Sequence, residues 1–136
     1  MTNQEKKAEL LKYQQAIHET DRLTGEIERW RARSEKMVSF VSDMPKASQD
    51  NLRGLEGNVE NIVELTRVLV GKYAEAVELR RALAASIEKV ESDRLRLILA
   101  YRYVDGMTLE AVAEQTGYSY RQITRLHGEA LTEIEV

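Results

Sequence analysis

The sequence predicts an all-α protein, in which a long antiparallel helical hairpin with coiled-coil packing is followed by a C-terminal helix-turn-helix. Three observations lead to this fold class. Residues from Leu52 to Val90 form a mostly apolar stripe at alternating spacings of three and four, the period of paired helices, and a similar but more polar stripe precedes it. Helix breakers are few, with one proline and seven glycines among 136 residues. Two helix-start signals and a glycine stop signal lie close together near the C-terminus.

The longest apolar pattern runs from Leu52 to Val90 and forms a heptad seam more than five repeats long. Its members are Leu52, Leu55, Val59, Ile62, Thr66, Leu69, Tyr73, Ala76, Arg80, Leu83, Ile87 and Val90. Val63, Val70 and Val77 form a second stripe beside the seam, so the apolar face is wider than one partner helix would use. We therefore expect one helix of about forty residues, near 60 Å long, with more than one neighbouring helix.

A similar but more polar stripe precedes it and supplies the first neighbour. This stripe contains Leu10, Tyr13, Ile17, Thr20, Thr24, Ile27, Trp30, Ser34, Met37 and Val41. Between the two patterns, Pro45 biases Met44 away from the helical conformation, and small polar residues surround it, which predicts a turn near residues 43–51. An intramolecular hairpin is the simplest arrangement, and an extended parallel dimer of both helices is the alternative.

The C-terminal third carries the start and stop signals. Thr108 can cap one helix, Gly117 supplies the left-handed position that ends it, and Ser119 with Gln122 forms a capping box for the next. A further helix is expected over residues 93–104. Residues expected to face inward are Leu95, Ile98, Leu99, Tyr103, Leu109, Val112, Ala113, Ile123, Leu126 and Ala130. The predicted domains are thus an oligomerising helical region, 1–92, and a helix-turn-helix domain, 93–136.

The outward positions at the start of the last helix are polar and basic. Arg side chains can bind guanine edges, Gln can bind adenine, and Ser and Thr can contact phosphate when such a helix enters a major groove. The DNA-binding residues predicted on this basis are Ser119, Tyr120, Arg121, Gln122, Thr124, Arg125 and His127. For His127, a phosphate contact and a structural contact both remain open. The plain alternative for the whole set is a solvated polar helix face.

The segments Tyr101-Arg-Tyr-Val-Asp-Gly-Met-Thr-Leu-Glu-Ala-Val-Ala, Gly117-Tyr-Ser and Arg125-Leu-His-Gly-Glu-Ala-Leu131 resemble region 4 of bacterial sigma factors. That region binds the promoter −35 element and contacts the polymerase flap. The variant Tyr118-Ser-Tyr-Arg-Gln-Ile-Thr-Arg-Leu-His127 more closely resembles small helical proteins of phages and integrative elements. Ala111 departs from the acidic residue usual in sigma factors, and no region 2 is present. The resemblance therefore implies a regulator rather than a self-sufficient sigma factor.

Composition narrows the remaining function classes. The chain has no cysteine and only two histidines, so we expect no disulfide, metal site or cofactor. The carboxylates are spread over long exposed helices, and no catalytic motif is found, so we expect no enzyme. No apolar run approaches the length of a membrane span and no signal peptide is recognised, which favours a cytoplasmic protein. The net charge of −3 argues against strong DNA binding by one chain alone.

The sequence thus predicts a sequence-specific DNA-binding protein, a transcription regulator of a phage or mobile element that resembles sigma region 4. The expected partners are double-stranded DNA, a second copy of the chain in a homo-oligomer whose simplest form is a dimer, and RNA polymerase. Two alternatives stay open. A DNA-packaging adaptor resembling a small terminase subunit should form a ring, and a protein-interaction module that contacts RNA polymerase would fit the acidic charge.

Overall fold

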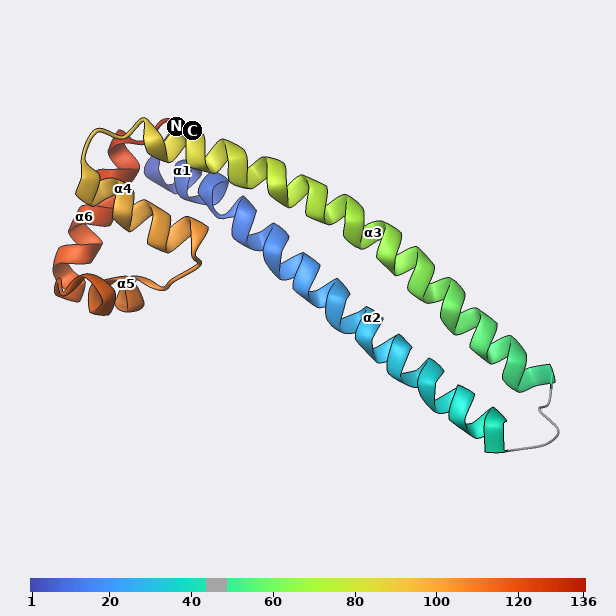
Figure 1. The fold of residues 1–136 in the computed structure, drawn as a ribbon. Helices are drawn as coiled ribbons and strands as arrows, with labels where there is room; N and C mark the ends of the chain where they lie inside the picture. Colours follow the sequence, from blue (N-terminus) through green and yellow to red (C-terminus); the bar gives the residue numbers. More distant parts are fainter. Residues whose placement is uncertain (44–48) are drawn as a thin grey trace. The chain divides into compact units, whose positions relative to one another are not determined.

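The computed structural model describes residues 1–43 and 49–136, and helices are the only regular secondary structure in this part of the chain, so the predicted all-α class is confirmed (Figure 1). The elements are α1 (Asn3–Leu10), α2 (Lys12–Asp43), α3 (Gln49–Glu88), α4 (Asp93–Leu99), the π-helix η1 (Ala100–Val104), α5 (Leu109–Thr116) and α6 (Tyr120–Glu133). The turn predicted near residues 43–51 centres on positions outside the described residues. The chain forms two compact units, residues 18–74 and residues 1–17 with 75–136.

In the unit of residues 18–74, α2 and α3 run side by side in opposite directions (Figure 1). The amide of Asn58 on α3 donates a hydrogen bond to Met37 Sδ on α2 at 3.2 Å. On α2 the buried residues are Thr20, Leu23 and Ile27, whereas Thr24, which the sequence placed on the stripe, is exposed. Leu23 therefore takes the inward position that was expected for Thr24.

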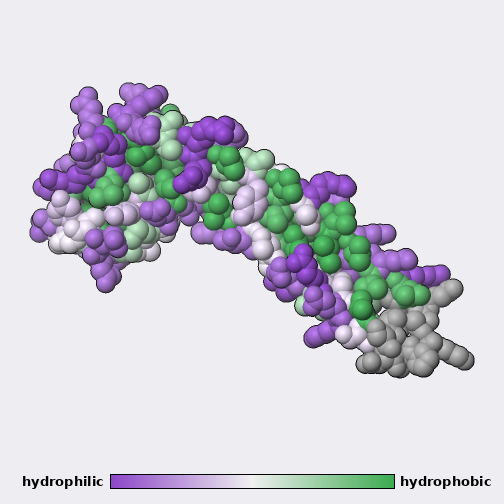
Figure 2. All heavy atoms as spheres, in the orientation of Figure 1, coloured by the Kyte–Doolittle hydropathy of each residue, from purple (hydrophilic) through white to green (hydrophobic). Residues whose placement is uncertain are grey.

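The register of α3 differs from the predicted seam. Seven of the twelve seam residues lie inward as expected, including Leu55, Ile62 and Leu69, but the other five are exposed, and among them Val59 and Tyr73 are about half exposed. Three further residues complete the inward face, each lying three positions after Leu55, Ile62 or Leu69. They are Asn58, Leu65 and Lys72, and all three are partly buried. The predicted seam combined residues from two neighbouring stripes of α3. Helix α2 can cover only one of these stripes, so the residues of the other stripe are exposed. Figure 2 shows hydrophobic residues in a band along the paired helices.

The unit of residues 1–17 and 75–136 has one hydrophobic core, built from elements far apart in the sequence. Its buried members are Leu10, Leu83, Ile87, Val90, Leu95, Ile98, Leu99, Tyr103, Val112, Ala113, Ile123, Leu126, Ala130, Leu131 and Ile134. The predicted helix over 93–104 is confirmed, although its last turn is a π-helix, which no sequence signal indicated. Because Leu10, Leu83, Ile87 and Val90 belong to this core, the predicted domain boundary at residues 92/93 falls inside it.

Polar contacts tie the first helices to this core. Lys6 Nζ donates to the carbonyl oxygens of Leu131 and Thr132 at 3.0 and 3.1 Å, near the end of α6. Gln14 Nε2 donates to the carbonyl oxygens of Tyr103 and Val104 at 3.1 and 2.8 Å. These are carbonyls at the end of η1, which have no further helical turn to donate to them. Residues 1–17 therefore satisfy backbone groups of the C-terminal helices.

A buried tyrosine–histidine pair lies within the same core. Tyr103 Oη and His127 Nε2 are 2.7 Å apart, and the two rings are stacked with centroids 5.7 Å apart. Burial raises the pKa of Tyr103 to about 12 and lowers the pKa of His127 to about 4, and the charges of Lys7 and Arg102 also lower the pKa of His127. At neutral pH the tyrosine hydroxyl is therefore protonated and donates to the neutral imidazole.

The first prediction is a pH dependence of stability that arises from His127. Its pKa in the folded chain lies below the value of 6.5 for an exposed histidine, so the unfolded chain binds more protons between these values. The free energy of unfolding should be full above about pH 6.5 and should fall toward pH 4 by about 3 kcal/mol from this group. Urea unfolding of the wild type and of His127→Gln across this range measures the difference.

The chain supplies its own control for that experiment. His18 is exposed, so His18→Gln replaces a histidine outside the core and should leave the stability at pH 7 unchanged. The His127→Gln variant should be less stable at pH 7 but lose less stability on acidification. Parallel pH profiles for the wild type and His127→Gln would show that the histidine does not titrate as the buried geometry requires.

The second prediction concerns the contact between Gln14 and η1. Gln14→Ala removes two hydrogen bonds to partly buried carbonyl groups and should lower the free energy of unfolding by about 1–3 kcal/mol. Gln15→Ala is the matched control, because the neighbouring Gln15 side chain is exposed. Equal stabilities of the two variants by urea unfolding would mean that these hydrogen bonds contribute nothing net to the fold.

Candidate nucleic-acid interface

The turn between α5 and α6 forms by the local signals that the sequence contains. Thr108 Oγ1 accepts a hydrogen bond from the backbone N–H of Ala111 at 3.1 Å, and Gly117 ends α5 in the left-handed conformation with φ of 80°. Ser119 Oγ accepts from the N–H of Gln122 at 3.1 Å, while Gln122 Oε1 accepts from the N–H of Ser119 at 2.9 Å. The predicted caps and capping box are confirmed, so the start of α6 is fixed by short-range hydrogen bonds.

Packing decides which face of α6 is exposed. Ile123, Leu126 and Ala130 are buried in the core together with Val112 and Ala113 of α5. The opposite face of the first two turns is exposed, and it contains the predicted residues Ser119, Tyr120, Arg121, Gln122, Thr124 and Arg125. The structure therefore brings these six residues together at one solvent-exposed end of one helix.

Within this group, the side chains differ in their availability. Thr124 Oγ1 donates to the carbonyl oxygen of Tyr120 at 2.9 Å, and Gln122 is engaged in the capping box. Arg121, Gln122 and Arg125 line a shallow hollow on the surface. A ligand in this hollow can meet both guanidinium groups directly, whereas Gln122 would first have to exchange its capping hydrogen bond for one to the ligand.

The assignment of His127 to this surface is corrected by its burial. The side chain is only 6% exposed, and its Nε2 accepts from the Tyr103 hydroxyl inside the core. It follows Leu126 directly and lies on the buried side of α6. Of the two interpretations left open, a phosphate contact and a structural contact, the structural contact is the one observed. The sequence could not show this, because the burial of His127 depends on a tyrosine that lies 24 positions earlier in the chain.

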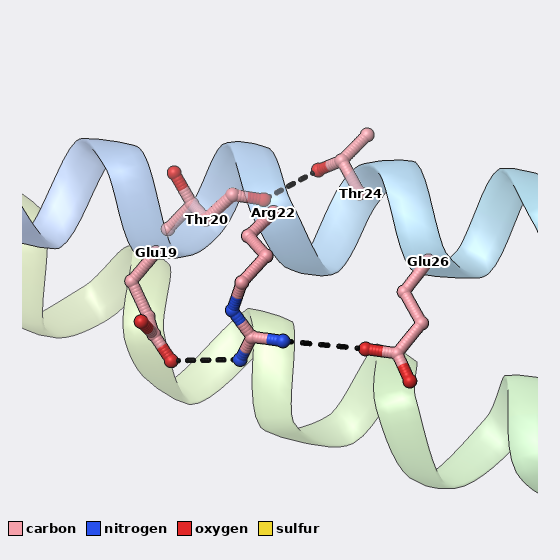
Figure 3. Close-up of polar contacts among 5 residues, drawn as sticks. All are labelled: Glu19, Thr20, Arg22, Thr24 and Glu26. Carbon is pink, nitrogen blue, oxygen red and sulfur yellow. Dashed lines mark hydrogen bonds and ion pairs between the residues drawn. The ribbon is translucent and has the colours of Figure 1, made fainter.

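Four arginines of the long helices, Arg22, Arg31, Arg67 and Arg81, are paired with acids on their own helix. Arg22 Nη2 lies 3.0 Å from Glu19 Oε1 and Arg22 Nη1 lies 3.5 Å from Glu26 Oε2 (Figure 3). The hydrogen bond to Glu19, together with the charges of both carboxylates, raises the pKa of Arg22 above its usual value. Further pairs of the same kind are Arg31–Glu28, Arg67–Glu64 and Arg81–Glu78.

Arg121 and Arg125 differ from those arginines. In the described part of the chain neither forms an ion pair, and no acidic residue occurs in the first two turns of α6. They lie four residues apart, so both guanidinium groups can project from one side of the helix. The N-terminus of a helix carries a partial positive charge, which adds to theirs. The site is therefore locally cationic in a chain with a net charge of −3.

A second cation near the turn was not identified from the sequence. The guanidinium of Arg94 on α4 lies 5.7 Å from the ring centroid of Tyr118, which is in the turn before α6. Arg94, Leu97, Tyr101 and Tyr118 also line a second open hollow with residues of α5. No local signal predicts this contact, because it depends on how α4 packs beside the turn.

No described helix combines the length and the apolar character that a membrane crossing requires. Among residues 1–43 and 49–136, no three His, Asp or Glu side chains gather closely enough to hold a metal ion. No protein-family model matches the chain, and neither curated proteins nor solved structures give a match.

Proposed function

We propose that this protein binds DNA sequence-specifically through the first two turns of α6, as a transcription regulator of a phage or mobile element that resembles sigma region 4. The observation that carries the proposal is the pair Arg121 and Arg125. They are exposed, they have no acidic partner in the described chain, and they lie at the N-terminal half of a helix whose opposite face is fully packed. A cationic helix end of this kind is suited to a polyanion.

In the proposed complex, α6 enters the major groove with its N-terminal half first. Arg121 and Arg125 bind guanine edges or phosphate oxygens, and Ser119 and Thr124 contact phosphate. Tyr120, which is 52% exposed, supplies an aromatic face and a hydroxyl at the start of the helix. Gln122 binds an adenine edge once it leaves the capping box. Base contacts give the specificity and phosphate contacts give the orientation.

Charge limits the affinity that one chain can reach. Residues 93–136 contain five basic and seven acidic residues, so the net charge of this segment is −2. Two arginines neutralise few phosphates, and the affinity should therefore depend only weakly on salt concentration. Self-association would compensate, because two linked sites raise each other's effective concentration at the DNA. The proposal therefore includes a homo-oligomer as the binding form.

One alternative function is favoured by a particular observation. The hollow lined by Arg94, Leu97, Tyr101 and Tyr118 combines apolar and aromatic surface with a cation, and Asp93 adds a carboxylate at its edge. Aromatic residues and arginine are enriched at protein interfaces. A module that holds RNA polymerase through this hollow would need no excess positive charge. Loss of polymerase binding in Leu97→Asp, with DNA binding unchanged, would support this alternative for the α4 surface.

The third prediction tests the α6 surface. Sites are first selected from random double-stranded DNA, and affinities are then measured by a mobility shift assay. Arg121→Ala should cost about 1–3 kcal/mol and relax the preference at one base if the residue binds a base edge. If it contacts only phosphate, all sequences should weaken alike. Arg121→Ala with Arg125→Ala should abolish specific binding while the fold, followed by circular dichroism, is retained.

The control for this test removes the same charge elsewhere. Arg22→Ala with Arg31→Ala deletes two exposed arginines of α2 that are paired with acids on their own helix, so it should leave DNA affinity nearly unchanged. Equal losses in the two double variants would mean that total charge, rather than α6, governs binding. Unchanged affinity in the Arg121/Arg125 double variant would remove α6 from the interface.

A further inference from the structure

Helix α3 carries an exposed apolar face that no described element covers. We call it the outer stripe, and its members are Glu56, Val59, Val63, Thr66, Val70, Tyr73, Val77 and Arg80. Their spacings alternate between three and four throughout, which is an unbroken heptad pattern. Its large apolar side chains are about half exposed, from 49% for Val59 to 64% for Val70. The outer stripe is therefore a second coiled-coil seam on the same helix.

Its position explains why α2 does not cover it. The seam that faces α2 contains Leu55, Ile62 and Leu69, and each of these is followed one position later by a residue of the outer stripe. One residue corresponds to about 100° around a helix, so the two seams need two different neighbours. From Glu56 to Arg80 the outer stripe extends roughly 36 Å along the helix. Soluble monomers seldom leave an apolar strip of this length uncovered.

The charges at the two ends identify the neighbour. Glu56 stands at the N-terminal end of the stripe and Arg80 at the C-terminal end, and neither forms an ion pair with another described residue. The stripe is symmetric about position 68. Residues at equal distances from this midpoint are Glu56 and Arg80, Val59 and Val77, Val63 and Tyr73, and Thr66 and Val70. Reversing the helix therefore matches acid with base and apolar with apolar at three of these four pairs.

We infer that the outer stripe docks antiparallel on the outer stripe of a second copy of this chain. Val70 of each copy then packs against Thr66 of the other, and Glu56 of each copy meets Arg80 of the other. A parallel pair in register would instead oppose Glu56 to Glu56 and Arg80 to Arg80, which is unfavourable. The inference specifies the self-association within the proposed function, but its tests use no DNA, so either can fail alone.

The fourth prediction tests the surface by mass. The wild type should be a dimer by light scattering at micromolar concentration. Val70→Asp should be a monomer with nearly unchanged helix content, because it places a carboxylate in the centre of the new interface. Val68→Asp is the matched control: this valine of α3 is also exposed but lies on the side of the helix opposite the outer stripe, so the dimer should persist.

Two results of this experiment would overturn the inference. A monomeric wild type would leave the stripe without a second copy. A dimer that survives Val70→Asp, or a larger ring that does, would place the association elsewhere. If Val70→Asp loses helix content, Val70→Lys decides the question. A monomeric Val70→Lys would show that the face is an interface, whereas a dimeric Val70→Lys would show that the aspartate acted only on folding.

The fifth prediction tests the orientation by charge. Glu56→Arg alone and Arg80→Glu alone should each weaken the dimer about tenfold or more, because like charges then face each other. The double variant Glu56→Arg with Arg80→Glu restores opposite charges across the interface and should recover most of the wild-type dissociation constant. Additive loss in the double variant would exclude the antiparallel pairing.

Cysteine cross-linking gives an independent measurement, because the chain has no cysteine of its own. Mixed Glu56→Cys and Arg80→Cys chains should form a disulfide-linked dimer under mild oxidation. Glu56→Cys alone should not, since the two copies of position 56 lie roughly 36 Å apart in the antiparallel pair. A disulfide between two Glu56→Cys chains would show a parallel pair and would overturn the inference.

Discussion

The unit of residues 1–17 and 75–136 depends on the burial of Tyr103, whose phenol hydroxyl must find a hydrogen-bond partner inside the core. His127 on α6 supplies the acceptor, and it can do so only as the neutral imidazole. The carbonyl of Tyr103 in turn accepts from Gln14 at the start of α2. One residue thus fixes α6 against η1 and draws the N-terminal segment into the same core. Because the contact with Tyr103 holds His127 on the buried side of α6, the opposite side of the helix is the exposed one.

Local signals predicted the parts of the structure that local chemistry forms. The caps of α5 and α6 are side chains bonded to backbone within three residues, so Thr108 and Ser119 could be assigned from the sequence. The register of α3 could not, because two apolar stripes overlap and only the position of α2 selects between them. Tyr73 was therefore placed in the core but is exposed. For the same reason the sequence left two interpretations of His127 open and gave Gln14 no role, since the partners of both residues are distant in sequence.

The distribution of charge matters more than its sum. Ion pairs along α2 and α3 place four arginines within one helical turn of an acid, so these four contribute to the charge count but offer little free positive charge: Arg22, Arg31, Arg67 and Arg81. At the start of α6 the arginines have no such neighbours. An acidic chain can therefore present a cationic site, and the net charge of −3 constrains the strength of a polyanion contact rather than its location.

The contact between the two ends of the chain also bears on folding. Asn3 and Thr132 are hydrogen-bonded across a sequence separation of 129 residues, so closing this unit requires contacts between residues far apart in the sequence. Residues 1–17 and 75–136 share one core, so neither segment can complete it without the other. Pairing of α2 with α3 brings the regions near positions 17 and 75 together beforehand and so shortens the effective loop that must close. We therefore expect the pairing of α2 with α3 to precede closure of this core.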